Sequence, residues 1–406
     1  FSATFLAFLK ENHIDPGIYQ VHRALPRYVR VLRYSQRETA EVERLIKQIQ
    51  HDAGCKVSRV HSVPGFLAIE DQAVRLSQLG AYTSGDIVGI DVSSGIAALS
   101  LSVTPGENVL DLCCAPGAKL IFIAELLNNS TSSAKGTVTG VDISPHRAAT
   151  CRSLVKRHAG MDKAFIRVYV EDGTTFGFRA PQDKWWDPKQ AMDAQAKAKC
   201  GPEWSSGGTS RRKRQKCMFD GQPWFAPKLL STEYACSGRE LYDRVLVDAE
   251  CTHDGSLVHI QKYEQWGWDQ LDAQVVGEGR SQTVPVLQSQ LLENGWRLLK
   301  VGGVLVYSTC SLSKYQNECV LGGFLSRHDQ SEACVEPIPM FGGNSNEIQA
   351  EMCNITASPI WSPTPDELCN ERMNDQIDLF ERMKHAVRLN PLVSNTSGMF
   401  IARIRK

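Results

Sequence analysis

An acid and two cysteines stand at the ends of two short apolar runs, and their types and spacing suit covalent chemistry. "VLVDAECTHDGS", residues 245–256, carries Asp248 at the end of its run and Cys251 three residues later. "VLVYSTCSLS", residues 304–313, ends a second run at Cys310. A thiolate is a nucleophile, and a carboxyl group beside it can hold or polarise a substrate. These three residues are therefore the candidate catalytic group.

Strand-like apolar runs alternate with helical patterns through the middle of the chain. Strands that alternate with helices are typical of βαβ units, so we predict an α/β fold with a mostly parallel, doubly wound sheet. The predicted strands cover residues 106–114, 136–144, 164–174, 243–250 and 302–310. The predicted helices cover 118–129, 145–160 and 283–303, and Pro145 opens the second of them.

Each predicted strand delivers an acid or a thiol at its carboxyl end. Ligands of open α/β sheets bind in the crevice at that edge. We therefore expect a binding site where these strands end. The strand-end residues are Asp111, Asp142, Asp172, Asp248 and Cys310.

The first of these strands leads into a turn of small residues, "DLCCAPGAK", residues 111–119. Pro116, Gly117 and Ala118 at the bend would let backbone amides approach a ligand at the positive end of the next helix. The turn is neither a Walker A loop nor a full G-x-G-x-x-G, so phosphate binding is poorly supported. Tight packing is the alternative explanation for these small residues.

The next two strand-end acids suit a ligand that carries adenosine. Asp142 stands where an acid accepts hydrogen bonds from ribose hydroxyls, and Asp172 is positioned to accept one from an adenine amino group. Adenosine without a requirement for phosphate indicates S-adenosyl-L-methionine as the cofactor.

Composition bounds the class of protein. A chain of 406 residues that is 42% hydrophobic can bury a large core and is expected to form two domains. Acids and bases balance at 45 each, so affinity for nucleic acid must come from local patches. The 13 cysteines show no C-x-x-C spacing and the histidines no ligand spacing, so we expect no metal and a reducing compartment.

No apolar stretch is long enough for a membrane span, so we expect no membrane partner. The expected reducing compartment implies an intracellular location, and we expect a monomer. Nucleus and cytoplasm both fit. An organelle is not excluded, because the chain opens at Phe1 and a leader peptide would be unobservable.

Three segments flank or interrupt the alternating pattern. Residues 1–85 predict a small α+β domain, and residues 176–240 a disordered insertion. "RRKRQK" at 211–216, inside that insertion, reads equally as a solvated charge run, a localisation signal or an RNA contact. Residues 340–395 are expected to form a second irregular stretch.

The early part of the chain is basic, which suits either a solvated face or phosphate contacts. The basic residues are Arg23, Arg27, Arg30, Arg33 and Arg37.

Taken in order, the motifs resemble those of the Sun (Fmu/RsmB-like) family of RNA cytosine-C5 methyltransferases. The segments that carry the resemblance are "GDIVGIDVSSGIAALSL", "DLCCAPGAK", "GVDISPHR", "VEDGT", "DRVLVDAECTHDG" and "VYSTCSLSKYQNE". They lie within residues 27–328, and "SGMFIARIRK" is similar to the family's closing strand. The resemblance implies a Rossmann-like class I methyltransferase domain over 86–406, after an RNA-positioning domain at 1–85.

The resemblance also implies a role for each site residue. Cys310 would be the nucleophile that attacks C6 of cytosine, Cys251 would assist product release, and Asp248 would hold the base through N3 and its amino group. The residues implied to contact S-adenosyl-L-methionine are Cys113, Cys114, Ala115, Pro116, Gly117, Ala118, Lys119, Asp142, Arg147, Asp172 and Asp248.

Two positions depart from the family pattern. Glu250 replaces the proline that usually precedes the second cysteine, which puts the geometry of that loop in doubt. Ala118 replaces a common glycine. We interpret the other cysteines, including Cys151, Cys319 and Cys334, as packing residues. Tyr263, Trp266 and Trp268 suit either core packing or stacking on RNA bases.

The sequence therefore predicts methyl transfer from S-adenosyl-L-methionine to C5 of a cytosine in structured RNA. Transfer RNA is slightly favoured over ribosomal RNA, because no long charged tail suggests assembly work. The rival from another class is a non-catalytic RNA-binding or ribosome-assembly factor on the same fold, which Glu250 alone supports.

Overall fold

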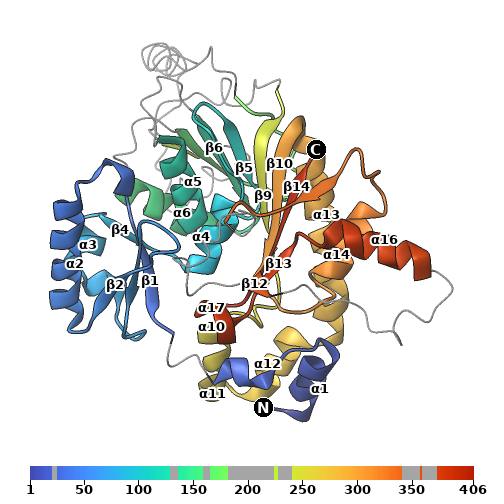
Figure 1. Ribbon diagram of the computed structural model, residues 1–406, viewed down its shortest axis with the longest axis horizontal. Coiled ribbons are helices and arrows are strands. Elements are labelled where there is room, and N and C mark those ends of the chain that lie inside the picture. Colours follow the sequence, from blue (N-terminus) through green and yellow to red (C-terminus); the bar gives the residue numbers. More distant parts are fainter. Residues whose placement is uncertain are drawn as a thin grey trace, which may run out of the picture.

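The protein consists of a large sheet and a small one, each with its own helices (Figure 1). The computed structural model describes residues 1–20, 25–128, 136–158, 165–181, 224–226, 240–340, 357–358 and 373–406. Among these residues, no helix is both long and apolar enough to cross a bilayer.

Five parallel strands form the centre of the large sheet. They lie in the order β10-β9-β5-β6-β7 and pair in parallel throughout. The chain runs outward from β5 through β6 to β7, then returns to β9 on the other side of β5. The strand order thus reverses between β5 and β9, where α/β sheets open a crevice for ligands. Their bounds are β5 Asn108–Asp111, β6 Thr137–Asp142, β7 Phe165–Val170, β9 Tyr242–Asp248 and β10 Leu299–Thr309.

Antiparallel strands extend both edges of this sheet. β14 (Met399–Arg405) pairs with β10, and β8 (Trp224–Ala226) pairs with β7. Three further short strands lie beyond or beside β14: β11 Cys334–Glu336, β12 Ala357–Ser358 and β13 Val387–Leu389. The predicted α/β class and all five predicted central strands are confirmed.

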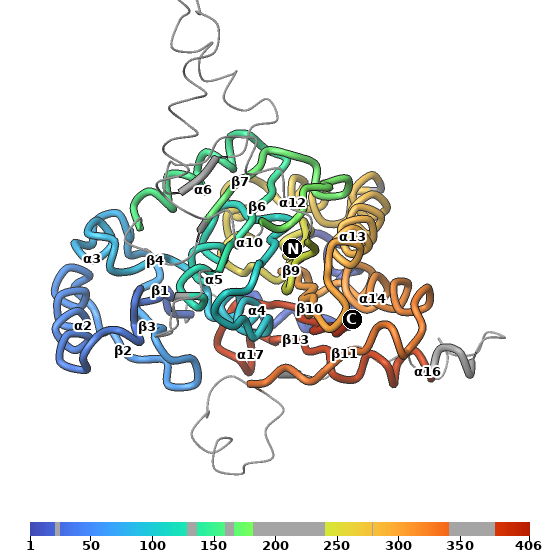
Figure 2. The backbone as a smooth tube through the Cα atoms, turned by 90° about the horizontal axis from the view of Figure 1, so that it is seen from above, coloured from blue at the N-terminus to red at the C-terminus, as the bar shows by residue number. Residues whose placement is uncertain are grey.

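Helices cover both faces of the large sheet (Figure 2). α4 (Val92–Leu99), α5 (Ala118–Asn128) and α6 (Pro145–Arg157) share one apolar cluster with the strands. α13 (Glu278–Leu298) and α14 (Glu318–Leu325) contribute to a second cluster on the opposite face. The central strands are buried on both sides, which explains their continuous apolar runs.

The small sheet has the order β2-β3-β1-β4 and carries α2 (Thr39–Ala53) and α3 (Gly80–Thr83). A capping box between Glu38 and Glu41 starts α2, and Gly54 ends it with a left-handed φ of 67°. The apolar stripe of α2 packs on the strands to form a separate core. The strands are β1 Arg27–Val31, β2 Val57–Arg59, β3 Phe66–Ile69 and β4 Ile87–Gly89.

The first helix, α1 (Ala3–Glu11), does not pack on this small sheet. Its Phe5, Phe8 and Leu9 join an apolar cluster with α10 (Leu257–Gln261), α11 (Tyr263–Trp266) and α12 (Trp268–Val275). Figure 1 shows the N-terminus beside α12. The small sheet also includes β4, beyond residue 85. The domain division at residue 85 therefore remains a proposal.

The structure tests one of two segments that were predicted to lack regular structure, the stretch 340–395, and leaves most of the other, 176–240, undescribed. The stretch 340–395 was expected to be irregular, but it contains α16 (Met373–Met383), β13 and α17 (Pro391–Ser394). That expectation is wrong for residues 373–394, because short elements there lack a long periodic pattern. Most of the predicted insertion at 176–240, including "RRKRQK" at 211–216, lies outside the described residues.

A buried ion pair joins the two parts of the protein. Arg30 of β1 donates two hydrogen bonds of 3.0 Å to the carboxylate of Glu125 on α5, and both side chains are at most 5% exposed. The guanidinium also lies 4.1 Å from the ring centroid of Phe122 and donates to the Pro64 carbonyl. Arg30 is therefore a structural residue and not the phosphate contact that its basic neighbourhood allowed.

Replacement of Glu125 by alanine should destabilise the protein by about 3–5 kcal/mol, because it leaves a buried guanidinium without a counter-charge. Urea unfolding followed by circular dichroism measures the change. The matched control is Glu381→Ala, which removes an exposed ion pair with Lys384 and should barely move the midpoint. Equal midpoints for the two variants would contradict the structural role of the Arg30–Glu125 pair.

Candidate active site

The two predicted catalytic cysteines lie side by side. The Sγ atoms of Cys251 and Cys310 are 3.1 Å apart, and Cys251 is fully buried whereas Cys310 is partly exposed. Burial and the neighbouring Cys310 raise the pKa of the Cys251 thiol well above its ordinary value. Cys251 is therefore protonated in the resting protein, and Cys310 has the more accessible sulfur.

Asp248 lies at the end of β9, directly opposite Ser308 in the parallel register with β10. Its Oδ1 accepts a hydrogen bond of 2.8 Å from the Ser308 hydroxyl, and its Oδ2 accepts one of 2.8 Å from Lys119 Nζ. Lys119 also donates to the Ser94 hydroxyl. Burial alone would lower the pKa of Lys119, but Asp248 outweighs it, so the pKa is raised and the ammonium is kept.

Polar contacts tie the loop after β9 to the loop after β10. Gly255 N donates to the Cys310 carbonyl at 2.9 Å, and the buried Asp254 accepts hydrogen bonds from Leu312 N and the Thr252 hydroxyl. Gln316 accepts from Thr252 N and donates back to the Thr252 hydroxyl. These bonds fix the position of one cysteine relative to the other.

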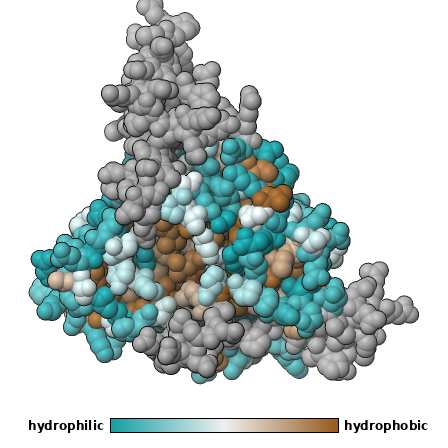
Figure 3. Space-filling view, turned by 45° about the horizontal axis from the view of Figure 1, so that its top comes forward, coloured by the Kyte–Doolittle hydropathy of each residue, from teal (hydrophilic) through white to brown (hydrophobic). Residues whose placement is uncertain are grey.

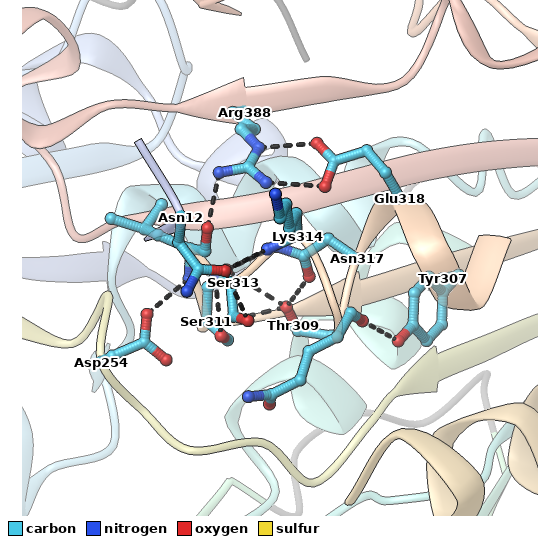
Figure 4. Close-up of polar contacts among 12 residues, drawn as sticks. Asn12, Asp254, Tyr307, Thr309, Ser311, Ser313, Lys314, Asn317, Glu318 and Arg388 are labelled. Carbon is cyan, nitrogen blue, oxygen red and sulfur yellow. Dashed lines mark hydrogen bonds and ion pairs between the residues drawn. The ribbon is translucent and has the colours of Figure 1, made fainter. Parts of the chain in front are cut away.

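A second layer of contacts holds the loop after Cys310 (Figure 4). Asn12 at the end of α1 accepts from the Ser313 hydroxyl and Lys314 N, each at 2.9 Å. Arg388 forms a bidentate pair with the buried Glu318 and donates to the Leu312 carbonyl. Elements distant in sequence, α1 and β13, thus position the cysteine loop.

The turn predicted to hold the cofactor lies at the edge where β5 ends. Asp111 is buried there, its Oδ1 accepts from Cys113 N at 3.2 Å, and its Oδ2 has no hydrogen-bond partner among the described residues. Gly117 has a φ of 107°, and a Cβ added there would lie 2.8 Å from Cys151 Sγ. The Cys114 side chain is buried in the core, so only its backbone belongs to the turn's outer surface.

Asp142 and Arg147 flank the same turn. Asp142 is buried, accepts from Ser144 N at 2.9 Å and lies 3.6 Å from Arg147 Nη1. Arg147 Nη2 donates to the Ala115 carbonyl at 2.9 Å, so it links the turn to the end of β6. Ile143, the next residue, is 65% exposed and offers an apolar surface beside the carboxylate. Ile143 was not among the predicted site residues, although its position directly after a strand-end acid is visible in the sequence.

Asp172 is held by its own loop. Its Oδ1 accepts from Thr174 N at 2.9 Å and from the Thr174 hydroxyl at 2.7 Å. Asn294 of α13 donates to the Gly173 carbonyl at 2.7 Å and so anchors the loop to the helix. Within the part of the chain that the structure describes, no hydrogen bond joins Asp172 to Asp142 or Asp248, and its adenine role remains a prediction.

Glu250, the departure from the family pattern, points its carboxylate to Arg280, 3.3 Å away. Its carbonyl accepts from Gln288 at 2.7 Å, which holds the loop without a proline. The pair is exposed, with side chains 43% and 33% accessible. An exposed pair of this kind has little effect on stability.

The packing role assigned to the remaining cysteines is confirmed for Cys151, which is buried against the cofactor turn. It is wrong for Cys319 and Cys334, which are exposed. Cys319 lies in the first turn of α14, and Cys334 begins the edge strand β11, where alternate residues face outward. Tyr263 is buried, Trp268 packs beside the cluster around α12, and Trp266 is 49% exposed.

His253 is a further residue of the site that was not among the predicted ones. Its Nδ1 lies 2.9 Å from Cys310 Sγ and 3.6 Å from Cys251 Sγ. The hydrogen bond to Cys251 is the main cause of a raised His253 pKa. The sequence signal for this contact is the Cys-x-His spacing of residues 251 and 253.

Comparison with known proteins identifies relatives for most of the chain. The profile of the family described as 16S rRNA methyltransferase RsmB/F matches residues 98–181 and 229–405. Ribosomal RNA small subunit methyltransferase B of Xanthomonas campestris is 27% identical over 270 residues, 65% of this chain and 43% of that protein.

Two further curated relatives act on different RNAs by name. Multisite-specific tRNA:(cytosine-C(5))-methyltransferase trm4b of Schizosaccharomyces pombe is 24% identical and covers 80% of this chain and 43% of its own length. The 5-cytosine rRNA methyltransferase NSUN4 of Bos taurus is 27% identical and covers 62% and 48%. The chain thus spans less than half the length of these relatives.

Solved structures share the fold. A methyltransferase homolog protein from Pyrococcus horikoshii superimposes with a TM-score of 0.57 at 21% identity and covers all of both chains. NSun6 from Pyrococcus horikoshii, solved with SFG, gives a TM-score of 0.57 at 18% identity, over 96% of this chain and 93% of its own. At these identities the likeness shows the fold alone. The predicted Rossmann-like methyltransferase fold is confirmed.

The buried carboxyl of Asp111 should make stability fall with pH. Burial, then the charge of Asp248, raises its pKa from 3.8 to about 7. Between these values the folded state binds more protons than the unfolded state, so the free energy of unfolding decreases as pH rises, by about 1.4 kcal/mol per pH unit. Asp111→Asn removes this titration.

Urea unfolding of wild type and Asp111→Asn at pH 4 and pH 8 tests this. The two proteins should be similar at pH 4, and the variant should be the more stable at pH 8. A stability difference that is the same at both pH values would contradict the raised pKa.

Proposed function

The chain belongs to the RsmB/F methyltransferase family, the Sun family that its motifs resemble, and from that premise we propose that it methylates C5 of a cytosine in RNA. The observation that carries the proposal is the pair of sulfurs 3.1 Å apart, one partly exposed and one buried, beside the strand-end carboxylate of Asp248. A single thiol would suffice for addition to a base. A second thiol beside it can serve to discharge the adduct.

S-adenosyl-L-methionine would supply an electrophilic methyl group at the edge where β5 and β6 end. The residues there fit its nucleoside: the Asp142 carboxylate can accept from ribose hydroxyls, and Ile143 exposes an apolar surface for a flat ring. Arg147 braces the turn through the Ala115 carbonyl. NSun6 of Pyrococcus horikoshii, with the same fold, was solved with SFG, an analogue of this cofactor.

Asp248 and Lys119 would grip the target base. The ammonium of Lys119 balances the Asp248 carboxylate across a hydrogen bond of 2.8 Å. That carboxylate can accept from the exocyclic amine of cytosine and from N3–H once N3 is protonated. Both contacts stabilise the electron-rich ring that forms when a thiolate adds to C6, so they strengthen during the reaction.

The two thiols would then act in sequence. Cys310 forms a bond from Sγ to C6, which places electron density on C5 for methyl transfer. The C5 proton must then leave so that the C5=C6 bond reforms and the Sγ–C6 bond breaks. Cys251, buried and 3.1 Å from the Cys310 sulfur, is close enough to serve this second step. The target base must leave its stack first, at a cost of a few kcal/mol.

Transfer RNA is the substrate class that we favour. The tRNA methyltransferase trm4b matches 80% of the chain, a larger share than the 65% and 62% matched by the two rRNA methyltransferases. Bisulfite sequencing of total RNA from cells with and without the gene would identify the RNA and the position. A site confined to ribosomal RNA would contradict this preference.

Cofactor affinity should depend on Asp142. Asp142→Ala removes the acceptor for the ribose hydroxyls, so calorimetry should show S-adenosyl-L-methionine binding at least about tenfold more weakly, the effect of losing a charged hydrogen bond. Glu381→Ala, an exposed acid on α16, is the control and should bind as wild type does. Unchanged affinity in Asp142→Ala would remove the ribose assignment.

A denaturing gel, run with cofactor and substrate RNA present, should distinguish the roles of the two cysteines through their alanine variants. Cys310→Ala has no route to a covalent RNA–protein adduct, whereas Cys251→Ala should attack, methylate and then stall as an adduct. Cys319→Ala, a change at an exposed cysteine, should turn over normally. An adduct with Cys310→Ala but none with Cys251→Ala would reverse the two roles.

The carboxylate of Glu250 offers a competing base for the C5 proton. If Glu250 removes the C5 proton, Cys251→Ala turns over slowly and accumulates little covalent adduct. The double variant Cys251→Ala/Glu250→Ala then accumulates more adduct. The same gel addresses the rival function, because a non-catalytic RNA-binding factor would give no adduct in any variant and no methyl transfer from labelled cofactor.

A further inference from the structure

His253 lies against both sulfurs of the active site. Its Nδ1 is 2.9 Å from Cys310 Sγ and 3.6 Å from Cys251 Sγ, while the sulfurs are 3.1 Å from each other. One imidazole nitrogen is therefore within hydrogen-bond reach of the exposed thiol and of the buried one. Such a nitrogen can accept a proton from either.

The backbone holds His253 in this position. Its φ of 58° is left-handed, a conformation that non-glycine residues rarely adopt. The neighbours on both sides are fixed: Thr252 is bound by Gln316 through its N–H, and Asp254 accepts from Leu312 N. The unusual backbone directs the ring to the sulfurs, and the buried contacts around it maintain that strain.

Several charged and titratable groups face this cluster from the surrounding elements. Lys119 of α5 and Asp248 of β9 interact electrostatically with Cys310 and His253 respectively, and Asp254 lies next to the histidine. His259 of α10 packs edge-on to His253, with ring centroids 5.5 Å apart, and Lys262 follows it. Among these groups, His253 alone forms a hydrogen bond to each sulfur.

We propose that His253 is the general base for both thiols in turn, a role that deepens the proposed cytosine methylation and rests on it. In the first step, Nδ1 takes the Sγ–H proton of Cys310, and the freed electron pair forms the Sγ–C6 bond. The imidazolium then releases its proton to solvent, because His253 is on the exposed side of the cluster.

In the second step, once the methyl group is on C5, Nδ1 takes the Cys251 thiol proton. The Cys251 thiolate removes the C5 proton, the C5=C6 bond reforms, and the Sγ–C6 electron pair returns to Cys310. The imidazolium finally protonates the Cys310 sulfur, so all three side chains regain their starting states. One proton is released per turnover.

This assignment explains how a buried thiol can act as a base. Burial raises the Cys251 pKa, so Cys251 does not hold a thiolate in the resting protein. A proton acceptor within reach of its sulfur is therefore required for its release role. The Glu250 carboxylate pairs with Arg280 at 3.3 Å, whereas His253 contacts the sulfur itself.

Alkylation of Cys310 tests the first proton transfer without RNA or cofactor. Iodoacetamide reacts with thiolates, so the alkylation rate of the Cys310 peptide, followed by mass spectrometry in reducing-agent-free buffer, reports deprotonation. In the Cys251→Ala background, His253→Asn should lower the rate at pH 7 by at least about threefold, and the difference should vanish above about pH 9, where solvent base suffices.

Asparagine is the replacement of choice because it tolerates a left-handed backbone. The matched control is His13→Asn, since His13 is exposed and has a φ of 54°. His13→Asn should leave the alkylation rate unchanged.

The protein with an intact His253 supplies a second test: its alkylation rate should rise through neutral pH, where histidine titrates. An alkylation rate that rises only near pH 8.5 in the protein with His253 would overturn the proposal. So would a His253→Asn rate that is lower by the same factor at every pH.

Single-turnover adduct formation with RNA and cofactor tests the reaction itself. In the Cys251→Ala background, His253→Asn should slow adduct formation by about 10²-fold at neutral pH, the low end for loss of a general base, with recovery at high pH. A rate independent of residue 253 would overturn the proposal. Absence of an adduct in any variant, with the alkylation difference intact, would instead contradict cytosine methylation and leave the thiol–imidazole pair standing.

Discussion

The active site depends on one constraint, the close approach of the loops that follow β9 and β10. The parallel register sets Asp248 opposite Ser308, and the bond from Gly255 N to the Cys310 carbonyl extends that pairing beyond the strands. A Cβ at Gly255 would lie 2.8 Å from the Cys310 carbonyl oxygen and 3.0 Å from the Gly398 carbonyl oxygen. A side chain at residue 255 would therefore push the two loops apart, and these loops carry the sulfurs that lie 3.1 Å from each other.

Polar groups, not apolar packing, maintain this approach. Asp254, Gln316, Asn317 and Glu318 are all buried, and each makes side-chain hydrogen bonds to a neighbouring loop or strand. Buried polar networks are costly when a partner is missing, but when satisfied they specify a single arrangement. A covalent mechanism that needs sulfurs, a base and a carboxylate within a few ångströms benefits from such rigidity.

The sequence predicts the parts of the site that follow from strand ends and from motif order. Asp248, Cys251 and Cys310 come together because parallel strands bring their carboxyl ends to one edge. The sequence does not predict contacts that depend on tertiary packing. Nothing in the pattern of α1 indicates that Asn12 would hold the loop after Cys310, or that Arg30 would be buried against Glu125. The spacing of Cys251 and His253 is visible in the sequence, but the approach of the imidazole to both sulfurs depends on a left-handed backbone at His253, which the sequence pattern does not reveal.

Burial and neighbouring charges give the titratable groups at the carboxyl ends of the central strands different protonation states. Asp111, desolvated and near Asp248, titrates near pH 7 instead of near 4. Lys119 keeps its charge, because the Asp248 carboxylate 2.8 Å away outweighs the effect of burial and raises the Lys119 pKa. Burial keeps the Cys251 thiol protonated, while its hydrogen bond raises the pKa of His253 above the ordinary 6.5. Groups with such divergent environments can divide acid and base work among themselves. In the proposed reaction, the Asp248 carboxylate holds the base, the partly exposed Cys310 sulfur attacks, and His253, which contacts both sulfurs, transfers the protons.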